Sequence, residues 1–251
     1  MSGPFRALVR PPGRRYPDAL TALVPPPPID LALALAQHAC YVGALRASGV
    51  DVIELAADDD HPDSVFVQDP VLVVDGCAIA LRSAATSRQG EADALIAVLE
   101  RCLQVARLRP PATLDGGDVL VTGDCLYVGL SARSNAEGCR QLAAITGRRV
   151  EGVTVPGGLL HLLSGCTYLG DDRLLVVQPL ASRFPQFEVV LVPPGEASAA
   201  NVLIVGRHAI VPSGYPRVAV LVEGSGFEVH AVPSSEFEKR DGGVTCRALL
   251  F

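Results

Sequence analysis

The pattern of a complete β-hairpin occupies the segment Asp115-Gly116-Gly117-Asp118-Val119-Leu120-Val121-Thr122-Gly123-Asp124-Cys125-Leu126-Tyr127-Val128-Gly129. The apolar runs Val119–Thr122 and Cys125–Gly129 predict two strands, and Gly123-Asp124 predicts a tight turn between them. A helix is predicted near Ala136–Thr146, directly after the hairpin. The segment therefore predicts a unit in which two antiparallel strands are followed by a helix.

The rest of the chain repeats this unit. Further hairpins are predicted at 71–81, 161–177 and 201–211. A fifth unit is predicted to begin at Cys246–Phe251 and to be completed by the N-terminal strand Phe5–Val9. The other predicted helices lie at 29–48, near 91–105 and near 215–224.

One polar residue stands at the mouth of each predicted hairpin. These five residues are Asp69, Asp115, His161, Asn201 and Cys246. They are separated by 46, 46, 40 and 45 residues, and a period of 20–50 residues is typical of repeat folds and propellers. If the repeats surround an axis, the five side chains converge on it. The alternative is a generic α/β protein with frequent hairpins.

Composition narrows the class of protein. The chain has 251 residues, 49% of them hydrophobic, and a net charge of −6, so it can form one large domain or two small ones. No basic stripe with interleaved aromatic residues is present, so nucleic acid is not an expected partner. The longest apolar run is shorter than the ~20 residues that a membrane span needs. The N-terminus Met1–Arg6 lacks an apolar signal core, so we expect a cytoplasmic protein with reduced thiols.

Seven cysteines are present, and none forms a Cys-x-x-Cys pair. Free cysteines are mostly small buried apolar residues, and we interpret six of them in this way: Cys40, Cys77, Cys102, Cys125, Cys139 and Cys166. Cys246 differs because it follows Asp241-Gly242-Gly243, where a flexible backbone can hold a side chain at a site. Cys246 is therefore the candidate nucleophile.

His161 lies between two leucines, where a lone histidine is usually structural. Its place at a hairpin mouth instead favours a catalytic role. The other four histidines lack that place and are interpreted as surface or turn residues: His38, His61, His208 and His230. No two histidines have metal-ligand spacing on a helix or hairpin, so no metal site is expected.

Charged residues near the hairpin mouths are candidates for substrate binding. Asp115-Gly116-Gly117-Asp118 suits either a turn or a site for a cation. The segment 63–69 is interpreted as strand-like, with its two aspartates on one face among valines, and a buried aspartate needs a cationic or hydrogen-bonding partner. Arg88 and Arg133 each follow a hairpin, either as ordinary surface arginines or as bidentate clamps for a carboxylate.

Six stretches of the chain together resemble the dimethylarginine dimethylaminohydrolase family, part of the guanidine-modifying superfamily that includes arginine deiminases and amidinotransferases. They are Gln37–Gly43, Pro62–Asp69, Leu114–Leu120, Val128–Asn135, Leu160–Ser164 and Asp241–Cys246. The resemblance covers about Leu33 to Phe251. It implies an α/β fold, a five-bladed α/β propeller of ββαβ-type repeats around a pseudo-fivefold axis, in a single catalytic domain over residues 1–251.

The resemblance also implies three catalytic residues. Cys246 corresponds to the nucleophile and His161 to the general acid and base. Asp115 corresponds to the carboxylate that orients His161 and contacts the guanidinium. No metal or organic cofactor is implied.

Six further residues correspond to substrate contacts. Asp69 would hold the guanidinium nitrogens, Asp63 and Gln68 the α-amino end, and Arg88 and Arg133 the α-carboxylate. Leu20, in the proline-rich loop 11–28, would close over the substrate as part of a lid. Gln68 stands where the family pattern usually has Glu, and the amide lacks the charge that favours an ammonium group.

The activity implied is hydrolysis of asymmetric dimethylarginine or monomethylarginine to citrulline and a methylamine, through a covalent thiouronium intermediate on Cys246. The preferred N-substituted guanidine stays open. Alternatives are an arginine deiminase, another substituted-guanidine hydrolase, or an amidinotransferase. A non-catalytic protein that binds arginine analogues is a further alternative. The expected partner is a small arginine derivative, and we leave a homodimer open.

Overall fold

The computed structural model describes residues 5–251, which form two compact units. Unit 1 contains the chain up to Val67 together with Asn201–Phe251, and unit 2 contains Gln68–Ala200. The described residues form five three-stranded sheets, two in unit 1 and three in unit 2. Whether the chain acts as a single catalytic domain stays a prediction.

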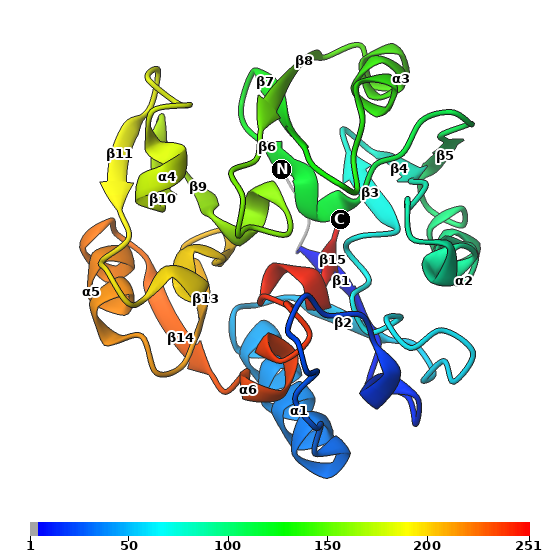
Figure 1. Cartoon of the computed structure of the whole chain (residues 1–251), viewed down its shortest axis with the longest axis horizontal. Helices are drawn as coiled ribbons and strands as arrows, with labels where there is room; N and C mark the ends of the chain where they lie inside the picture. The colour runs from blue at the N-terminus through cyan, green and yellow to red at the C-terminus, as the bar shows by residue number, and fades with distance from the viewer. Residues whose placement is uncertain (1–4) are drawn as a thin grey trace. The chain divides into compact units, whose positions relative to one another are not determined.

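The three sheets of unit 2 share one chain order, visible in Figure 1. In each sheet an antiparallel hairpin is followed by a helix and by a third strand parallel to the second. The first repeat consists of β3 (Val71–Val74), β4 (Cys77–Ala80), α2 (Glu91–Leu99) and β5 (Gln104–Arg107). The second consists of β6 (Val119–Val121), β7 (Cys125–Leu130), α3 (Ala136–Thr146) and β8 (Arg149–Thr154). The third consists of β9 (Cys166–Gly170), β10 (Arg173–Val176), α4 (Gln178–Ala181) and β11 (Glu188–Leu191).

Unit 1 contains the other two repeats. One consists of β12 (Leu203–Val205), β13 (His208–Pro212), α5 (Pro216–Gly224) and β14 (Glu228–Val232). The other consists of β15 (Leu249–Leu250), β1 (Arg6–Val9), α1 (Leu31–Ala47) and β2 (Asp51–Glu54). β1 lies antiparallel to β15 and parallel to β2. The prediction that the N-terminal strand completes the last repeat is confirmed.

Local chemistry explains several element boundaries. Asp75 and Gly76 have φ angles of 49° and 76°, the left-handed backbone that a two-residue hairpin turn requires. Helix α1 begins after Asp30, whose carboxylate accepts a hydrogen bond from the N–H of Leu33. Gly49, which follows this helix, has a φ of 78°. These turn and helix-end predictions are confirmed.

Three predicted elements are wrong: the end of one helix, the segment 63–69, and the start of the strand predicted from His161. The helix predicted near 91–105 ends at Leu99, because Gln104–Arg107 pairs in parallel with β4 as strand β5. The segment 63–69 is a series of turns and not a strand. Its buried apolar residues resemble a strand in the sequence, but Ser64 and Phe66 donate their N–H groups to carbonyls three residues back, as turns do.

Four of the five hairpin-mouth residues lie within a short 3-10 helix or directly next to one. They are η3 (Gly116–Asp118), η4 (Leu162–Ser164), η5 (Ala197–Ala200) and η6 (Thr245–Arg247). The strand predicted from His161 therefore begins only at Cys166. His161 is the residue before η4, and Cys246 lies within η6.

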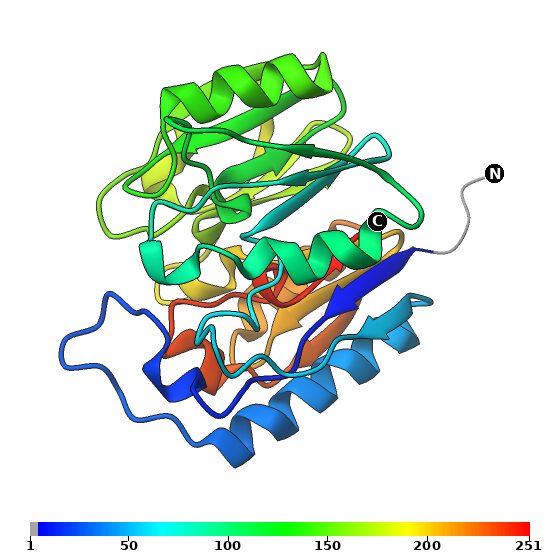
Figure 2. The ribbon, with the colours of Figure 1, turned by 90° about the vertical axis from the view of Figure 1, so that its right-hand side faces the viewer.

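The proline-rich segment 11–28 contains one short 3-10 helix, η1 (Tyr16–Asp18), and is otherwise irregular. Figure 2 shows it in blue as a loop that leads into α1. The guanidinium of Arg240 donates hydrogen bonds to the carbonyls of Pro17 and Pro27, at 2.8 and 3.0 Å. The loop is thereby fixed to the rest of unit 1 on both sides of Val24, which is itself exposed.

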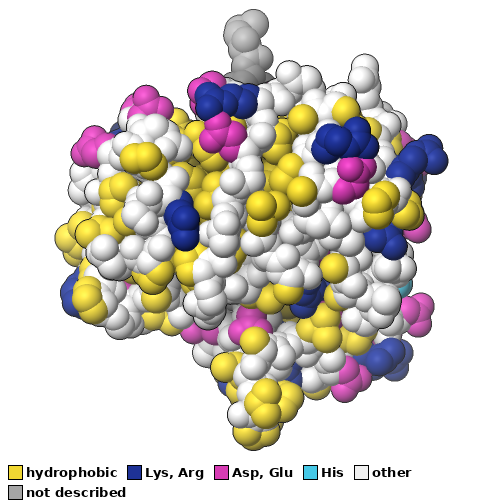
Figure 3. Space-filling model, turned by 45° about the horizontal axis from the view of Figure 1, so that its top comes forward, with side chains coloured by type: hydrophobic (Ala, Val, Ile, Leu, Met, Phe, Trp, Pro, Cys, Tyr) yellow, Lys and Arg dark blue, Asp and Glu magenta, His cyan; other side chains and the backbone are white. Residues whose placement is uncertain are grey.

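Each unit has its own apolar core, and the surface carries paired charges. In unit 2, β3, β4, β6 and β7 contribute leucine, isoleucine and valine to one cluster. Figure 3 shows basic and acidic side chains next to one another at several places on the face in view. The exposed ion pairs of the chain include Arg140–Glu137 and Arg149–Glu151. Exposed pairs contribute little, about 0–1 kcal/mol each, so the cores supply most of the stability. No helix among residues 5–251 is long and apolar enough to cross a membrane.

Candidate active site

His161 and Asp115 form a buried pair in unit 2. Nε2 of His161 lies 3.3 Å from Oδ2 of Asp115, and Asp115 has no exposed surface. The guanidinium of Arg133 donates to the same Oδ2 at 3.4 Å. The other oxygen of Asp115, Oδ1, has no hydrogen-bond partner among residues 5–251. Asp115 therefore orients His161 and keeps one buried acceptor for a further donor.

Three carboxylates determine the charge of His161. Burial by itself would lower the pKa of His161, but the negative charge of Asp69, the hydrogen bond with Asp115 and the charge of Asp118 together raise it. The imidazole therefore favours its protonated form more than a free histidine does. A protonated imidazole among carboxylates can donate a proton to a leaving group.

Gly117 permits the close packing of this site. A Cβ atom at Gly117 would lie 2.6 Å from Nδ1 of His161 and 2.9 Å from Oδ1 of Asp69. The N–H of Gly117 donates to the same Oδ1 of Asp69 at 3.0 Å. The Gly-Gly pair at 116–117 thus brings backbone donors next to the carboxylates, as a cation-binding segment requires.

Asp118 holds the site together, whereas the sequence indicated it only as part of the possible cation site 115–118 and gave it no role of its own. Its Oδ2 accepts 2.6 Å hydrogen bonds from the hydroxyls of Ser131 and Ser134, and its Oδ1 accepts one from the N–H of Leu162 at 2.9 Å. Burial raises the pKa of Asp118, although the charge of His161 and these donors oppose the shift. Asp118 therefore fixes the backbone next to His161. The sequence signal was the pair of carboxylates, Asp115 and Asp118, on either side of two glycines.

Asp69 forms a buried ion-pair group with Arg88 and Glu91. Arg88 donates from Nη1 to Asp69 at 2.6 Å and from Nη2 and Nε to Glu91 at 2.7 and 3.0 Å. Burial favours the neutral acid, but the charges of Arg88 and His161 outweigh burial and hold the pKa of Asp69 below its usual value. Glu91 was not predicted. Two carboxylates against one guanidinium leave this group with a net negative charge.

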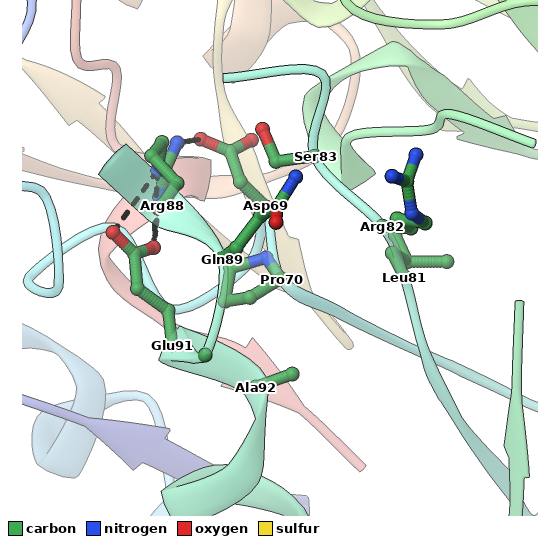
Figure 4. A pocket seen from close by; sticks show the side chains of 10 residues that line it. Asp69, Pro70, Leu81, Arg82, Ser83, Arg88, Gln89, Glu91 and Ala92 are labelled. Atoms are coloured by element: carbon green, nitrogen blue, oxygen red, sulfur yellow. Dashed lines mark hydrogen bonds and ion pairs between the residues drawn. The ribbon is translucent and has the colours of Figure 1, made fainter. Parts of the chain in front are cut away.

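A pocket of about 170 Å³ adjoins this group within unit 2. Figure 4 shows the guanidinium of Arg88 between the carboxylates of Asp69 and Glu91, with Arg82 on the other side of the pocket. The pocket is smaller than the 300–1,000 Å³ typical of sites that enclose a whole ligand. It is large enough for only part of a ligand.

Gln68 precedes Asp69 at the start of unit 2. Its side-chain oxygen is buried and has no hydrogen-bond partner among residues 5–251. Its backbone carbonyl lies so close to Gly116 that a Cβ atom there would collide with it. Gln68 therefore offers a fixed acceptor that the folded chain leaves unused.

Cys246 lies in an apolar part of unit 1. The residue is 9% exposed and belongs to a cluster with Tyr16, Phe66 and Phe237. The next residue, Arg247, is fully buried between the rings of Tyr41 and Phe237, with its guanidinium carbon 4.1 and 4.3 Å from their centroids. The charge of Arg247 interacts favourably with a thiolate at Cys246.

Asn201 positions the short helix that carries Cys246. Its side-chain amide donates to the hydroxyl of Thr245 at 2.8 Å and accepts from the N–H of Thr245 at 2.9 Å. Gly243 lies so close to Asn201 that a Cβ atom there would collide with the amide. The sequence placed Asn201 among the hairpin-mouth residues, and the structure gives it a positioning role.

Two predicted substrate contacts lie together in unit 1. The backbone N–H of Leu20 donates to both oxygens of Asp63, at 3.1 and 3.4 Å. Asp63 is buried, whereas the side chain of Leu20 is exposed. The partner that a buried aspartate needs is thus supplied in part by the loop 11–28. Whether that loop acts as a lid stays a prediction.

Some interpretations of single residues are wrong. Cys40 and Cys102 are exposed, although Cys125 and Cys166 are buried as expected. His38 is buried on α1, where burial lowers its pKa to about 4. The sequence could not show this, because α1 has apolar residues on every side.

Comparisons with known proteins identify the relatives of this chain. A family model described as N,N dimethylarginine dimethylhydrolase, eukaryotic, matches residues 28–156. The N(G),N(G)-dimethylarginine dimethylaminohydrolase of Pseudomonas aeruginosa is 40% identical over 97% of this chain and 98% of its own length. The Streptomyces coelicolor protein of the same name is 40% identical over 96% of this chain and 95% of its own. A solved structure of the Pseudomonas aeruginosa protein, a cysteine-to-serine variant complexed with citrulline, covers 98% of both chains with a TM-score of 0.94 and 38% identity.

The five ββαβ-type repeats and this structural likeness confirm the α/β propeller class that the sequence predicted. The chain is a protein of the guanidine-modifying superfamily. Within that superfamily it belongs to the dimethylarginine dimethylaminohydrolase family, as predicted.

Proposed function

We propose that this protein hydrolyses Nω-methylated arginine, asymmetric dimethylarginine or monomethylarginine, to citrulline and a methylamine. The observation that carries this proposal is the buried pair of His161 and Asp115 among further carboxylates, with Oδ1 of Asp115 lacking a partner among residues 5–251. A buried carboxylate without a donor suits a cationic substrate with N–H groups, such as a guanidinium. Membership of a family of hydrolases that act on C–N bonds supports the same reaction.

Cys246 is the proposed nucleophile, and His161 is the proposed general acid and base. A guanidinium is a poor electrophile, so the reaction needs a thiolate, and a free thiol is only a few per cent ionised at neutral pH. In the proposed reaction Cys246 attacks the guanidino carbon, and protonated His161 gives its proton to the departing amine. The covalent thiouronium intermediate is then hydrolysed by a water molecule that His161 deprotonates, which releases citrulline.

The remaining contacts are proposed as substrate contacts. Asp69 and Asp115 hold the guanidinium, and Asp63 and Gln68 accept hydrogen bonds from the α-amino group. The α-carboxylate is held by two arginines, Arg88 and Arg133. Arg88 is already paired with two carboxylates, so the more exposed guanidinium of Arg133 carries more of this contact. Leu20 is proposed to cover the substrate from the loop 11–28.

The test is incubation with asymmetric dimethylarginine while citrulline and dimethylamine are measured. Cys246→Ser is expected to form no citrulline. Cys40→Ser, which changes an exposed cysteine, is the matched control and is expected to retain full activity. The same assay is run with unsubstituted arginine while ammonia is measured.

The results of these assays distinguish the candidate functions from one another. Turnover of unsubstituted arginine in place of dimethylarginine would identify an arginine deiminase. Binding of dimethylarginine without turnover would identify a binding protein, and transfer to an added amine would identify an amidinotransferase. Citrulline formation that survives Cys246→Ser would refute the mechanism. A homodimer and a cytoplasmic location stay predictions.

A further inference from the structure

Two histidines and a glutamate converge on one face of a sheet in unit 1. His208 is paired with Glu228 across the parallel strands β13 and β14, and His230 is paired with Ile210. Residues two apart on a strand point to the same face, so His208, Glu228 and His230 share that face. The sequence showed no two histidines at metal-ligand spacing, because His208 lies 20 and 22 residues before Glu228 and His230 and meets them only where the strands pair.

The donor atoms lie at distances that suit a shared ion. Nδ1 of His208 is 3.1 Å from Nε2 of His230. Oε2 of Glu228 lies 3.5 Å from Nδ1 of His208, and Oε1 of Glu228 lies 3.9 Å from Nε2 of His230. Ligands bonded at 2.0–2.1 Å to a tetrahedral zinc ion are separated by about 3.3 Å. Shifts of a few tenths of an ångström would bring all three ligands into place.

The surroundings also fit an ion site. Ile210 and Val232, on the same face, belong to the apolar core of unit 1, and the two imidazoles lie at the margin of that core with 26% and 21% of their surface exposed. The histidines are thus held by packing, whereas Glu228 is 68% exposed and free to adjust. No fourth His, Cys, Asp or Glu joins the group among residues 5–251. Water or an added ligand would complete the coordination.

We propose that His208, Glu228 and His230 form a binding site for a divalent transition-metal ion of the zinc type. Two imidazoles and one carboxylate favour zinc, cobalt, nickel or copper over magnesium and calcium, which prefer oxygen ligands. The proposed metal site does not include Cys246, the proposed nucleophile. In the register of β12 and β13, His208 lies opposite Val205, at the end of β12 away from Asn201. The proposal therefore stands whether or not the proposed hydrolase activity is correct.

Isothermal titration with Zn²⁺ tests the site on the full chain carrying Cys246→Ser, which removes the candidate nucleophile as a zinc ligand. We expect one bound ion per chain. The variants His208→Gln, His230→Gln and Glu228→Gln are each expected to weaken binding by more than about tenfold, the loss that even an indirect ligand contact causes. His61→Gln is the matched control. Its imidazole is similarly exposed and contacts the carboxylate of Asp58, but within residues 5–251 it belongs to no group of three potential metal ligands.

Two results would overturn the proposal. One is the absence of zinc binding to the parent chain. The other is unchanged binding in the double variant His208→Gln/His230→Gln, which would place the zinc on cysteines or elsewhere. Should the histidine variants fail to fold, Glu228→Gln decides the question, because its exposed side chain does not support the core. Titration with Mg²⁺ is expected to give no binding at this site, and competition by Mg²⁺ would equally contradict the assignment.

Discussion

His161 is a buried imidazole whose charge depends on its neighbours. Its pKa is raised because Asp69, Asp115 and Asp118 outweigh the effect of burial. A group whose pKa is higher in the folded state stabilises that state fully below its unfolded pKa of about 6.5. The stabilisation is lost as pH rises through the raised pKa.

The first prediction follows from the raised pKa of His161. The difference in the free energy of unfolding between the parent chain and His161→Gln is expected to be largest below about pH 6.5. It should decrease as the pH rises above that value, because deprotonation of His161 removes the attraction that the variant lacks. Urea denaturation at a series of pH values measures this difference. A difference that stays constant or grows with pH would contradict the raised pKa of His161.

The second prediction concerns Gln68. A carboxylate at this position would form a charge-assisted hydrogen bond with the α-ammonium group of the substrate. Gln68→Glu is therefore expected to lower KM for dimethylarginine by about tenfold, the factor that ~1.4 kcal/mol gives. The control substrate is Nα-acetyl-dimethylarginine, which lacks the ammonium charge and should show no such gain. Equal changes for both substrates would remove Gln68 from the amino end.

The sequence predicted some residues of the candidate active site and missed others. His161 and Asp115 were expected to act together, and the structure pairs them. Glu91 was missed as a site residue and Asp118 was given no role of its own, because a local sequence does not show which distant groups a carboxylate will meet. Asp118 contacts Ser131, Ser134 and Leu162 only after three segments have folded together.

Among the elements, the 3-10 helix η6 depends on side chains from distant segments. Thr245 is held by Asn201, and the carbonyl of Val244 accepts a hydrogen bond from the hydroxyl of Tyr41 at 2.7 Å. A three-residue helix has little stability of its own. The position of Cys246 is therefore set by these tertiary contacts.

The third prediction tests this dependence. Asn201→Ala leaves the buried N–H of Thr245 without its acceptor and is expected to destabilise the protein by about 1–3 kcal/mol. It should also lower kcat more than it raises KM, because Cys246 adjoins Thr245. The conservative variant Asn201→Asp retains the acceptor and should recover much of the loss. Denaturation and steady-state kinetics measure both effects, and an unchanged kcat in Asn201→Ala would exclude the positioning role.

Element boundaries show where pattern reasoning fails. The hairpins from Val71 and Val119 and the helix Ala136–Thr146 match the predictions, because each has turn or cap residues of its own. The segments 63–69 and 161–165 were predicted as strands and are turns or 3-10 helix. Both are buried, and burial gives similar apolar sequences to strands and to packed turns.

At the scale of the whole molecule, the first and last strands of the described chain, β1 and β15, pair in one sheet. The N–H groups of Arg6 and Phe251 donate to each other's carbonyls at 2.9 Å. Leu249 is buried in β15, and the guanidinium of Arg6 lies 5.0 Å from the ring of Phe251. Unit 1 is closed by this pairing, directly after the segment that carries Cys246.

The fourth prediction is that removal of residues 249–251 destabilises the protein by about 3–5 kcal/mol, from one buried leucine and several backbone hydrogen bonds. Activity should fall with stability, because η6 loses the strand that follows it. Replacement of the same residues by alanines keeps the backbone pairing and should cost less. Thermal denaturation compares the two variants. An equally stable truncated chain would show that β15 does not hold the fold together.

The sequence by itself determined the number and order of the repeats, most turns, and the identity of the residues at the hairpin mouths. These follow from local chemistry: alternating apolar strands, Asp-Gly turns and helix caps act within a few residues of chain. The tertiary structure alone decided which charges meet. It paired Arg88 with Asp69 and Glu91, placed Arg247 between two rings, and brought His208 and His230 together. The physical reason is that burial and partner charges depend on strand pairing between segments far apart in the chain, which no local pattern contains.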